Sequence, residues 1–201
     1  MEDNKEERER VIKETIKEVV SKHSDKLSPH EIRMHEKLLE KIHIQGKRPF
    51  EAMDIPKEFI EWFYSNAFNL YNSAKYEEAR KIFYILNVFD PQDSRFWYGL
   101  AACHHMEKQY DVAIFGYTKC LFIPPVNPMT YFHLADCYEK LGFKREAAVM
   151  LQTCIKHASS DTQYASMQTR AKKELEQLLQ QIEKEADEED RKEATAESKK
   201  E

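Results

Sequence analysis

Small and large apolar residues recur at a fixed spacing of 34 residues through the middle of this chain. An alanine marks the twentieth position of each copy, at Ala79, Ala113 and Ala147. Within each copy, apolar residues return every three or four positions along two successive stretches, which is typical of amphipathic helices. The pattern therefore predicts three successive helix pairs. The predicted helices are 58–72 and 76–89 in the first copy and 94–106 and 110–122 in the second, and the third copy spans 128–161.

Other positions of the repeat explain why the two helices of each copy should pack together. Small residues stand at the eighth and twentieth positions, where helices cross closely, and bulky residues surround them. Proline follows the second helix in two copies, because it cannot continue a helix. This is the tetratricopeptide pattern, which predicts an all-α superhelix of three helix-pair repeats with a concave face suited to peptides. The matching residues are Phe63, Trp97 and Tyr131 (fourth position), Ala67, Ala101 and Ala135 (eighth), Phe83, Tyr117 and Leu151 (twenty-fourth), and Pro91 and Pro125 (thirty-second).

The segments before and after the repeats are predicted to be helical as well. Ser28 followed by Pro29 and Glu31 is a typical helix start. The helix that begins there carries an apolar stripe, Leu38, Leu39 and Ile42, which lies outside the repeats and needs a cover. The predicted regions are a charged helical extension (1–27), a possible dimerisation helix with a connector (28–57), the repeats (58–161), a C-terminal capping helix (162–184) and a charged tail expected to be disordered (185–201).

Composition narrows the class of protein. Only 4 of 201 residues are glycine and 7 are proline, which favours long helices over a barrel or sandwich. No apolar run is long enough to span a bilayer, and the charged N-terminus does not resemble a secretory signal, so we expect a cytoplasmic protein without membrane insertion. The net charge is −5, and no stripe of basic and aromatic residues appears, so nucleic acid is not an expected partner.

The four cysteines, Cys103, Cys120, Cys137 and Cys154, are each 17 residues apart, which could indicate disulfides or a metal site. They occupy equivalent positions in successive helices, however, and no Cys-x-x-Cys pair or cluster of histidines accompanies them. We therefore predict reduced, structural thiols and no cofactor. No nucleophile elbow, phosphate loop or zinc-protease motif is present, so an enzyme is not expected.

One long stretch goes beyond a generic repeat. The segments AFNLY, KYEEARKIF, DSRFWYGLAAC and QYDVAIFGY within Ile55–Leu179 resemble the class II chaperones of type III secretion systems. The resemblance implies a bacterial cytoplasmic protein that binds hydrophobic translocator subunits and keeps them soluble until export. It also implies a free homodimer formed through the helix before the repeats. The translocator is expected to offer an extended segment near its N-terminus that contains proline and leucine, similar to P-x-L-x-x-P.

The first helix of each repeat should line the concave face through its second, fifth, ninth and twelfth positions. An aromatic row at the fifth position, Tyr64, Tyr98 and Phe132, marks this groove, although such aromatics could also simply pack between repeats. By the resemblance, Tyr64, Tyr71, Tyr76 and Tyr98 contact cargo, and Leu100 and Tyr117 support them from below. His105 is expected to face the groove and His104 the core. The predicted groove residues are Tyr64, Phe68, Tyr71, Tyr76, Arg95, Tyr98, Leu100, Ala102, His105, Tyr117, Met129, Phe132 and Asp136.

Two other peptide-binding functions remain to be weighed. A clamp for the C-terminal carboxylate of a heat-shock protein needs lysine and asparagine at the fifth and ninth groove positions of the first repeat. Those positions hold Tyr64 and Phe68, so an anionic terminus would have no partner there. A generic scaffold or assembly protein that binds another peptide stays open as the alternative.

Overall fold

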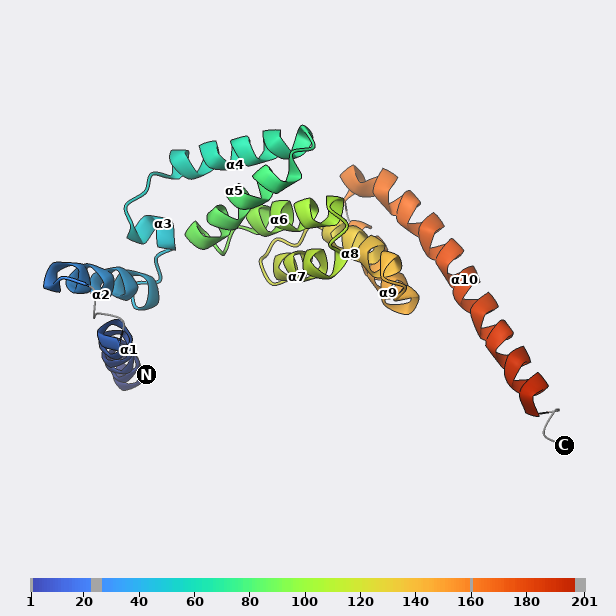
Figure 1. The fold of residues 1–201 in the computed structure, drawn as a ribbon, viewed down its shortest axis with the longest axis horizontal. Coiled ribbons are helices and arrows are strands. Elements are labelled where there is room, and N and C mark those ends of the chain that lie inside the picture. Colours follow the sequence, from blue (N-terminus) through green and yellow to red (C-terminus); the bar gives the residue numbers. More distant parts are fainter. Residues whose placement is uncertain (1, 23–26, 160, 198–201) are drawn as a thin grey trace.

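The computed structural model describes residues 2–22, 27–159 and 161–197, and these residues form helices without any strand. Three antiparallel helix pairs make up the middle of the chain and stack side by side (Figure 1). The pairs correspond to the three predicted repeats, which confirms the predicted tetratricopeptide architecture. The pairs are α4 (Lys57–Asn72) with α5 (Tyr76–Phe89), α6 (Ser94–Met106) with α7 (Tyr110–Leu121), and α8 (Pro128–Lys140) with α9 (Lys144–Ala158).

Close helix crossings at small residues hold each pair together. Ala67, Ala101 and Ala135, the eighth residues of the three repeats, are buried, with at most 2% of their surface exposed. A Cβ atom placed on Gly116 of α7 would lie 2.9 Å from the Cβ of Ala101, which is closer than carbon atoms can approach. The backbones of α6 and α7 are therefore in contact, as small residues at these positions require.

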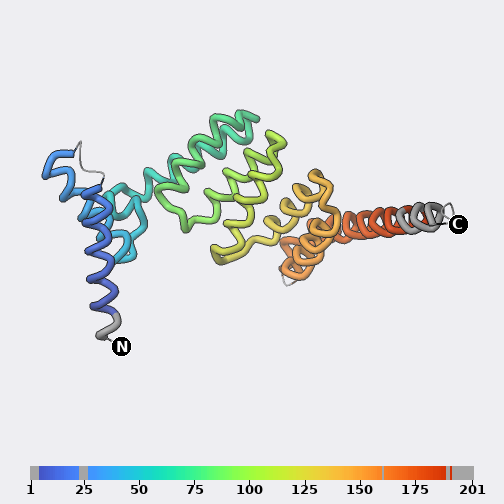
Figure 2. The backbone as a smooth tube through the Cα atoms, turned by 60° about the horizontal axis from the view of Figure 1, so that its bottom comes forward, coloured from blue at the N-terminus to red at the C-terminus, as the bar shows by residue number. Residues whose placement is uncertain are grey.

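The N-terminal segments form a unit beside the first repeat. Helix α1 (Glu2–Lys22) packs on α2 (Pro29–His43), with Ile16 and Val20 of α1 buried. Ser28 caps α2 through the predicted capping box with Glu31. Figure 2 shows this pair set apart from the stacked repeats. The apolar stripe of α2 thus receives part of its cover from α1 of the same chain.

The segment expected to be a plain connector contains a short helix, α3 (Pro49–Ala52). Its preceding residue, Arg48, donates a hydrogen bond of 2.9 Å to the carboxylate of Asp90, at the end of the first repeat. Asp90 is buried, and desolvation raises the pKa of its carboxyl group. Phe50 of α3 joins the apolar core of the first repeat. These contacts fix the N-terminal unit to the repeats.

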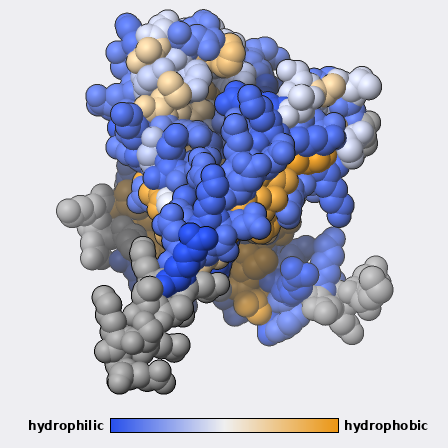
Figure 3. Space-filling model, turned by 90° about the vertical axis from the view of Figure 1, so that its right-hand side faces the viewer, coloured by the Kyte–Doolittle hydropathy of each residue, from blue (hydrophilic) through white to orange (hydrophobic). Residues whose placement is uncertain are grey.

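The C-terminal helix is longer than the sequence suggests. After a short 3-10 turn (Thr162–Tyr164), α10 (Ala165–Glu197) packs against α9 through the buried residues Ala171 and Leu178. It then continues well past residue 184, where a disordered tail was expected, because its last turns consist of strong helix formers such as Glu, Lys and Ala. Residues 198–201 of that tail, and 23–26 of the N-terminal extension, lie outside the described residues. Figure 3 shows this end of the molecule as mostly hydrophilic, with a narrow band of hydrophobic residues.

The four cysteines lie in the helices as free, buried thiols. Burial raises the pKa of Cys103, Cys120 and Cys137 to about 12, so these groups stay protonated at neutral pH. They act as small apolar core residues, as their repeat-equivalent positions predict. Among the described residues, no helix is long and apolar enough to cross a membrane.

Replacing Ala101 by leucine should destabilise the protein by about 1–3 kcal/mol, because Ala101 is fully buried against Gly116 and the larger side chain must displace a helix. Urea unfolding followed by circular dichroism measures this free energy. Ala186→Leu is the matched control, since Ala186 is exposed on α10 and both residues favour helix. Equal loss in the two variants would contradict the close crossing.

Candidate peptide-binding groove

The first helices of the repeats, α4, α6 and α8, form one face of the stack, here called the inner face. A cavity of about 280 Å³ lies on this face and is named the aromatic groove. Its walls combine aromatic side chains with a few polar groups, which suits a peptide with apolar anchors. The groove is lined by Tyr64, Phe68, Tyr71, Phe83, Arg95, Tyr98, Gly99, Ala102, His105, Met106, Tyr117 and His133.

Aromatic rings from different helices support one another around the groove. Tyr64 and Phe68 stack along α4 with ring centroids 6.3 Å apart. Tyr98 meets the edge of Tyr117 at 5.5 Å, which links α6 to α7. Phe68 keeps 49% of its surface exposed. Phe68 is therefore an apolar side chain at the groove that is half open to solvent.

Arg95 joins the first and second repeats beside the groove. Its guanidinium donates to both carboxylate oxygens of Glu61 on α4, at 2.8 and 3.1 Å, and to the carboxylate of Asp93, at 2.6 Å. It also lies 4.8 Å from the centre of the Tyr64 ring, within cation–π range. The hydrogen bonds to Asp93, and then those to Glu61, raise the pKa of Arg95. Arg95 therefore holds Tyr64 in place by its charge and its stacking.

The floor of the groove becomes polar toward the third repeat. His105 Nε2 of α6 lies 2.7 Å from a carboxylate oxygen of Asp136 on α8, and this contact lowers the pKa of Asp136. His133 lies almost parallel to Tyr117, with ring centroids 5.5 Å apart. Burial, reinforced by the nearby His105, lowers the pKa of His133 to about 4. His133 is therefore neutral at physiological pH and behaves as an aromatic wall residue.

Eight of the thirteen residues predicted for the groove line this cavity in the structure. Asp136 also reaches it indirectly, through its hydrogen bond to His105. For the seven on first helices this placement is consistent with the predicted helical periodicity, and Tyr117 of α7 was predicted from the family resemblance. The role of each residue in binding stays a prediction. The eight are Tyr64, Phe68, Tyr71, Arg95, Tyr98, Ala102, His105 and Tyr117.

Phe132 and Tyr76 lie elsewhere than predicted. Phe132 occupies the fifth position of the third repeat, but it is buried, and Arg170 of α10 lies 4.9 Å above its ring. The C-terminal helix thus closes the inner face at the third repeat, which the repeat pattern could not indicate. Tyr76 packs edge-on against Tyr71 at a ring-centroid distance of 5.4 Å and does not itself line the groove. Met129, also predicted for the groove, is likewise not among the lining residues.

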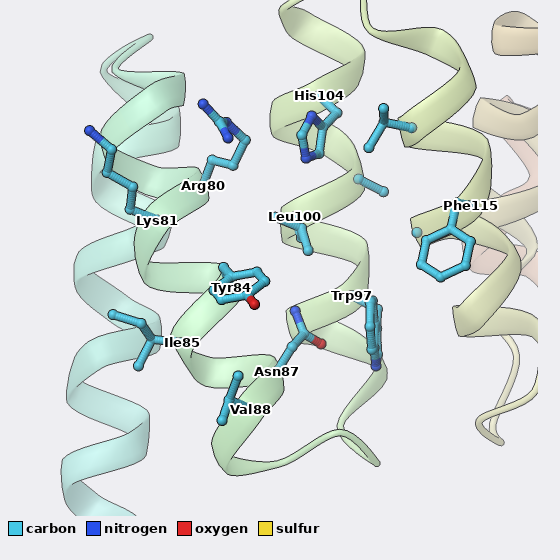
Figure 4. A pocket seen from close by; sticks show the side chains of 13 residues that line it. Arg80, Lys81, Tyr84, Ile85, Asn87, Val88, Trp97, Leu100, His104 and Phe115 are labelled. Atoms are coloured by element: carbon cyan, nitrogen blue, oxygen red, sulfur yellow. The ribbon is translucent and has the colours of Figure 1, made fainter.

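Leu100, predicted for the groove, and His104, predicted for the core, lie elsewhere in the structure. Both line a larger cavity of about 730 Å³ on the opposite, outer face, between α5 and α7 (Figure 4). Leu100 follows Gly99 by one residue, so the helical turn of about 100° carries it out of the groove. His104 does not enter the core: its Nδ1 lies 2.6 Å from the Gln109 side-chain oxygen. Exposed Tyr84 also lines this outer cavity.

Sequence reasoning also missed groove residues that depend on packing between helices. A Cβ atom on Gly99 would lie 2.3 Å from the Phe83 ring, so glycine at this position lets Phe83 of α5 reach the groove floor. His133 follows the fifth position by one residue, and Met106 ends α6. A glycine inside a helix is the one sequence signal that could have suggested a close approach here.

The chain is similar to proteins of known class. The tetratricopeptide repeat family model matches residues 94–115. Low calcium response locus protein H of Yersinia pestis is 37% identical over 125 residues, which cover 62% of this chain and 74% of that protein. The type III secretion translocator chaperone SycD of Yersinia enterocolitica is 36% identical, with a TM-score of 0.62. The matched region covers 64% of this chain and 89% of the SycD chain. The structure of SycD of Yersinia enterocolitica in complex with a peptide of the translocator YopD is 35% identical, with a TM-score of 0.61. The matched region covers 62% of this chain and 95% of that chain.

The partly buried His133 predicts a loss of stability in acid. Its pKa falls from 6.5 to about 4 on folding, so the unfolded chain binds the proton more readily between these values. Stability should therefore drop by about 2–3 kcal/mol as the pH falls from 7 to 4. His133→Phe should remove this part of the pH dependence, as measured by urea unfolding at several pH values.

The slope of stability against pH is the readout, since the substitution may change the absolute stability at every pH. His157→Phe is the control, because His157 is exposed and stacks on Tyr131 at 5.1 Å in a comparable ring pair. An unchanged slope in His133→Phe would show that His133 is not the group whose titration lowers the stability.

Proposed function

Because the chain belongs to the family of type III secretion translocator chaperones, we propose that it binds a hydrophobic translocator subunit and keeps it soluble before export. The aromatic groove holds an extended segment of this cargo. The family consists of chaperones. We infer that this chain likewise binds its partner without catalysing a reaction, and that it does so in the bacterial cytoplasm.

The observation that carries this proposal is the aromatic groove itself. Ordered aromatic rings around a cavity on the inner face, with Phe68 half exposed, leave apolar surface that a partner would cover. Arg95 is already satisfied by Glu61 and Asp93, so the groove offers no free cation for a C-terminal carboxylate. An internal segment with proline and leucine anchors fits this surface better than a charged chain end.

Binding of this kind explains how aggregation is prevented. A translocator segment exposes apolar side chains that would otherwise associate with each other, and the groove removes them from water. The sequence contains no nucleotide-binding motif, so the mechanism includes no nucleotide cycle. Release then follows from competition or from an external machine that draws the cargo away.

The N-terminal unit supports a second element of the proposal, self-association of the free chaperone. Leu38, Leu39 and Ile42 of α2 are only half-buried, although α1 packs beside them. An apolar cavity of about 340 Å³ opens between α1 and α2, with exposed Val11 at its edge. We assign this α1–α2 face to a homodimer contact.

Phe68→Ala should lower the affinity for a proline- and leucine-containing peptide by about thirtyfold, because a buried anchor at an interface commonly contributes about 2 kcal/mol or more. Its melting temperature should stay near that of the parent, since Phe68 is half exposed. Tyr98 is a poorer choice for this test, because it packs against Tyr117 and His133. Isothermal titration calorimetry with the peptide gives the affinity.

Phe122→Ala provides the matched control, since Phe122 is 79% exposed and lies outside the groove. It should bind the peptide as the parent does. Equal affinity for the parent, Phe68→Ala and Phe122→Ala would remove the groove as the cargo site and favour a scaffold that uses another surface.

Val11→Glu should convert the free protein to a monomer while its helix content is retained, because a charge at the edge of the α1–α2 cavity would be buried in the dimer. Light scattering coupled to gel filtration measures the mass. Lys17→Glu, an exposed position on the same helix, should leave the mass unchanged. A dimer in both variants would place self-association on another surface.

A further inference from the structure

The outer cavity, of about 730 Å³, is a trough on the face opposite the aromatic groove. Its walls come from two second helices, α5 and α7, and α6 lies between them and forms the floor (Figure 4). The floor residues Trp97, Leu100, Ala101 and His104 follow one another by three, one and three positions, so they form a single stripe along α6. A trough between two helices with such a stripe as its floor has the shape that accepts the side-chain ridge of a further helix.

Large apolar side chains along both walls of the outer cavity are open to solvent. Tyr84, Ile85 and Val88 of α5 are exposed, and so are Val112 and Phe115 of α7. Single apolar residues at a surface are ordinary, but a continuous apolar patch usually marks a binding surface. The outer cavity is therefore apolar surface that none of the described helices covers.

Both polar side chains of the floor already have partners within the chain. The Trp97 indole N–H donates to the carbonyl oxygen of Pro91 at 3.0 Å, and His104 Nδ1 lies 2.6 Å from the Gln109 side-chain oxygen. An extended segment laid on this floor would bring its own backbone N–H and C=O groups against apolar surface without partners, which is costly. A helix satisfies its backbone internally. The floor therefore favours a helical occupant.

The charges at the edge of the outer cavity balance each other. Arg80 lies 3.2 Å from a carboxylate oxygen of Glu107, and Lys81 lies 2.7 Å from a carboxylate oxygen of Glu77. Because both cations of the lining are paired, a charged side chain brought into the cavity would be buried without a counter-ion. The surface is complementary to an uncharged, apolar helix face.

We propose that the outer cavity receives the apolar face of a helix from the same translocator subunit whose extended segment occupies the aromatic groove. This inference rests on the proposed function. A hydrophobic cargo has further apolar segments, and a long apolar segment removed from water satisfies its backbone by forming a helix. The aromatic groove, of about 280 Å³, holds a few anchor side chains and leaves such a helix uncovered. A second copy of this chain suits the cavity less well, because the proposed homodimer uses the α1–α2 face, and no residue of that face lines this cavity.

A model helix tests the outer cavity. The probe is a labelled peptide of about 18 residues, with leucine at i, i+3, i+4 and i+7 on an alanine, glutamate and lysine background. Fluorescence anisotropy with the full chain should show binding about tenfold tighter than for a peptide of the same composition whose leucines point to all sides.

Val88→Glu should weaken binding of the model helix by about tenfold, because it places a charge against the apolar face of the peptide. Val149→Glu is the matched control and should bind as the parent does. The two valines are 57% and 52% exposed on the second helices α5 and α9, and of the two only Val88 lines the cavity. Equal affinity of the parent and Val88→Glu would overturn the inference, as would a parent that does not distinguish the two peptides.

Two further measurements tie the helix to the cavity and to the cargo. Trp62→Phe leaves Trp97 as the one tryptophan of the chain, and its emission should shift to shorter wavelength when the model helix covers the floor. Joined through a long glycine and serine linker to a P-x-L-x-x-P segment, the model helix should bind about tenfold more tightly than either part alone, because one chain then holds both surfaces. An unshifted emission or no gain on joining would overturn the inference.

The outcomes separate this inference from the proposed function. Phe68→Ala should bind the model helix as the parent does, and an excess of the P-x-L-x-x-P peptide should not displace it. Displacement would place the helix in the aromatic groove and overturn the inference while leaving the proposed function intact. Loss of a dimer in Val88→Glu, measured by light scattering, would assign the cavity to a second copy instead. A parent that does not bind the P-x-L-x-x-P peptide would contradict the proposed function itself.

Discussion

The structure depends on the close approach of paired helices at small residues. Ala101 and Gly116 bring the backbones of α6 and α7 together, and Ala67 and Ala135 occupy the same place in the neighbouring repeats. Dispersion and burial at these crossings stabilise helices that would be marginal alone. The tight crossing also sets the angle between the two helices of a repeat, and repetition of that angle orients the first helices toward one face.

The aromatic groove follows from this arrangement. Its side chains come from first helices of all three repeats, and second helices supply Phe83 and Tyr117 through its floor. Gly99 allows Phe83 to approach, so one missing Cβ atom shapes the wall against which a peptide would lie. Helix α10 then covers Phe132 and limits the groove at the third repeat. The aromatic groove is therefore a product of contacts between repeats, and no single repeat contains it.

Polar contacts bridge the repeats where apolar packing alone would not fix their register. Arg95 joins α6 to α4 through Glu61, and His105 joins α6 to α8 through Asp136. Both contacts border the groove, so they stiffen its walls. A preorganised surface of this kind loses less entropy when a partner binds.

The sequence by itself determined the helices of the repeats, their order and their buried small residues. The reason is that the 34-residue period and the 3.6-residue helical turn are local patterns, visible along the chain itself. Periodicity also placed seven groove residues on the inner face, since it fixes the side of a helix on which a residue lies, and the family resemblance added Tyr117 of α7. Only the tertiary structure decided that Leu100 faces outward, that Phe132 is covered by α10 and that His133 and Phe83 enter the groove. These outcomes depend on distances between helices that are far apart along the chain, and such distances follow from packing, which sequence periodicity does not encode.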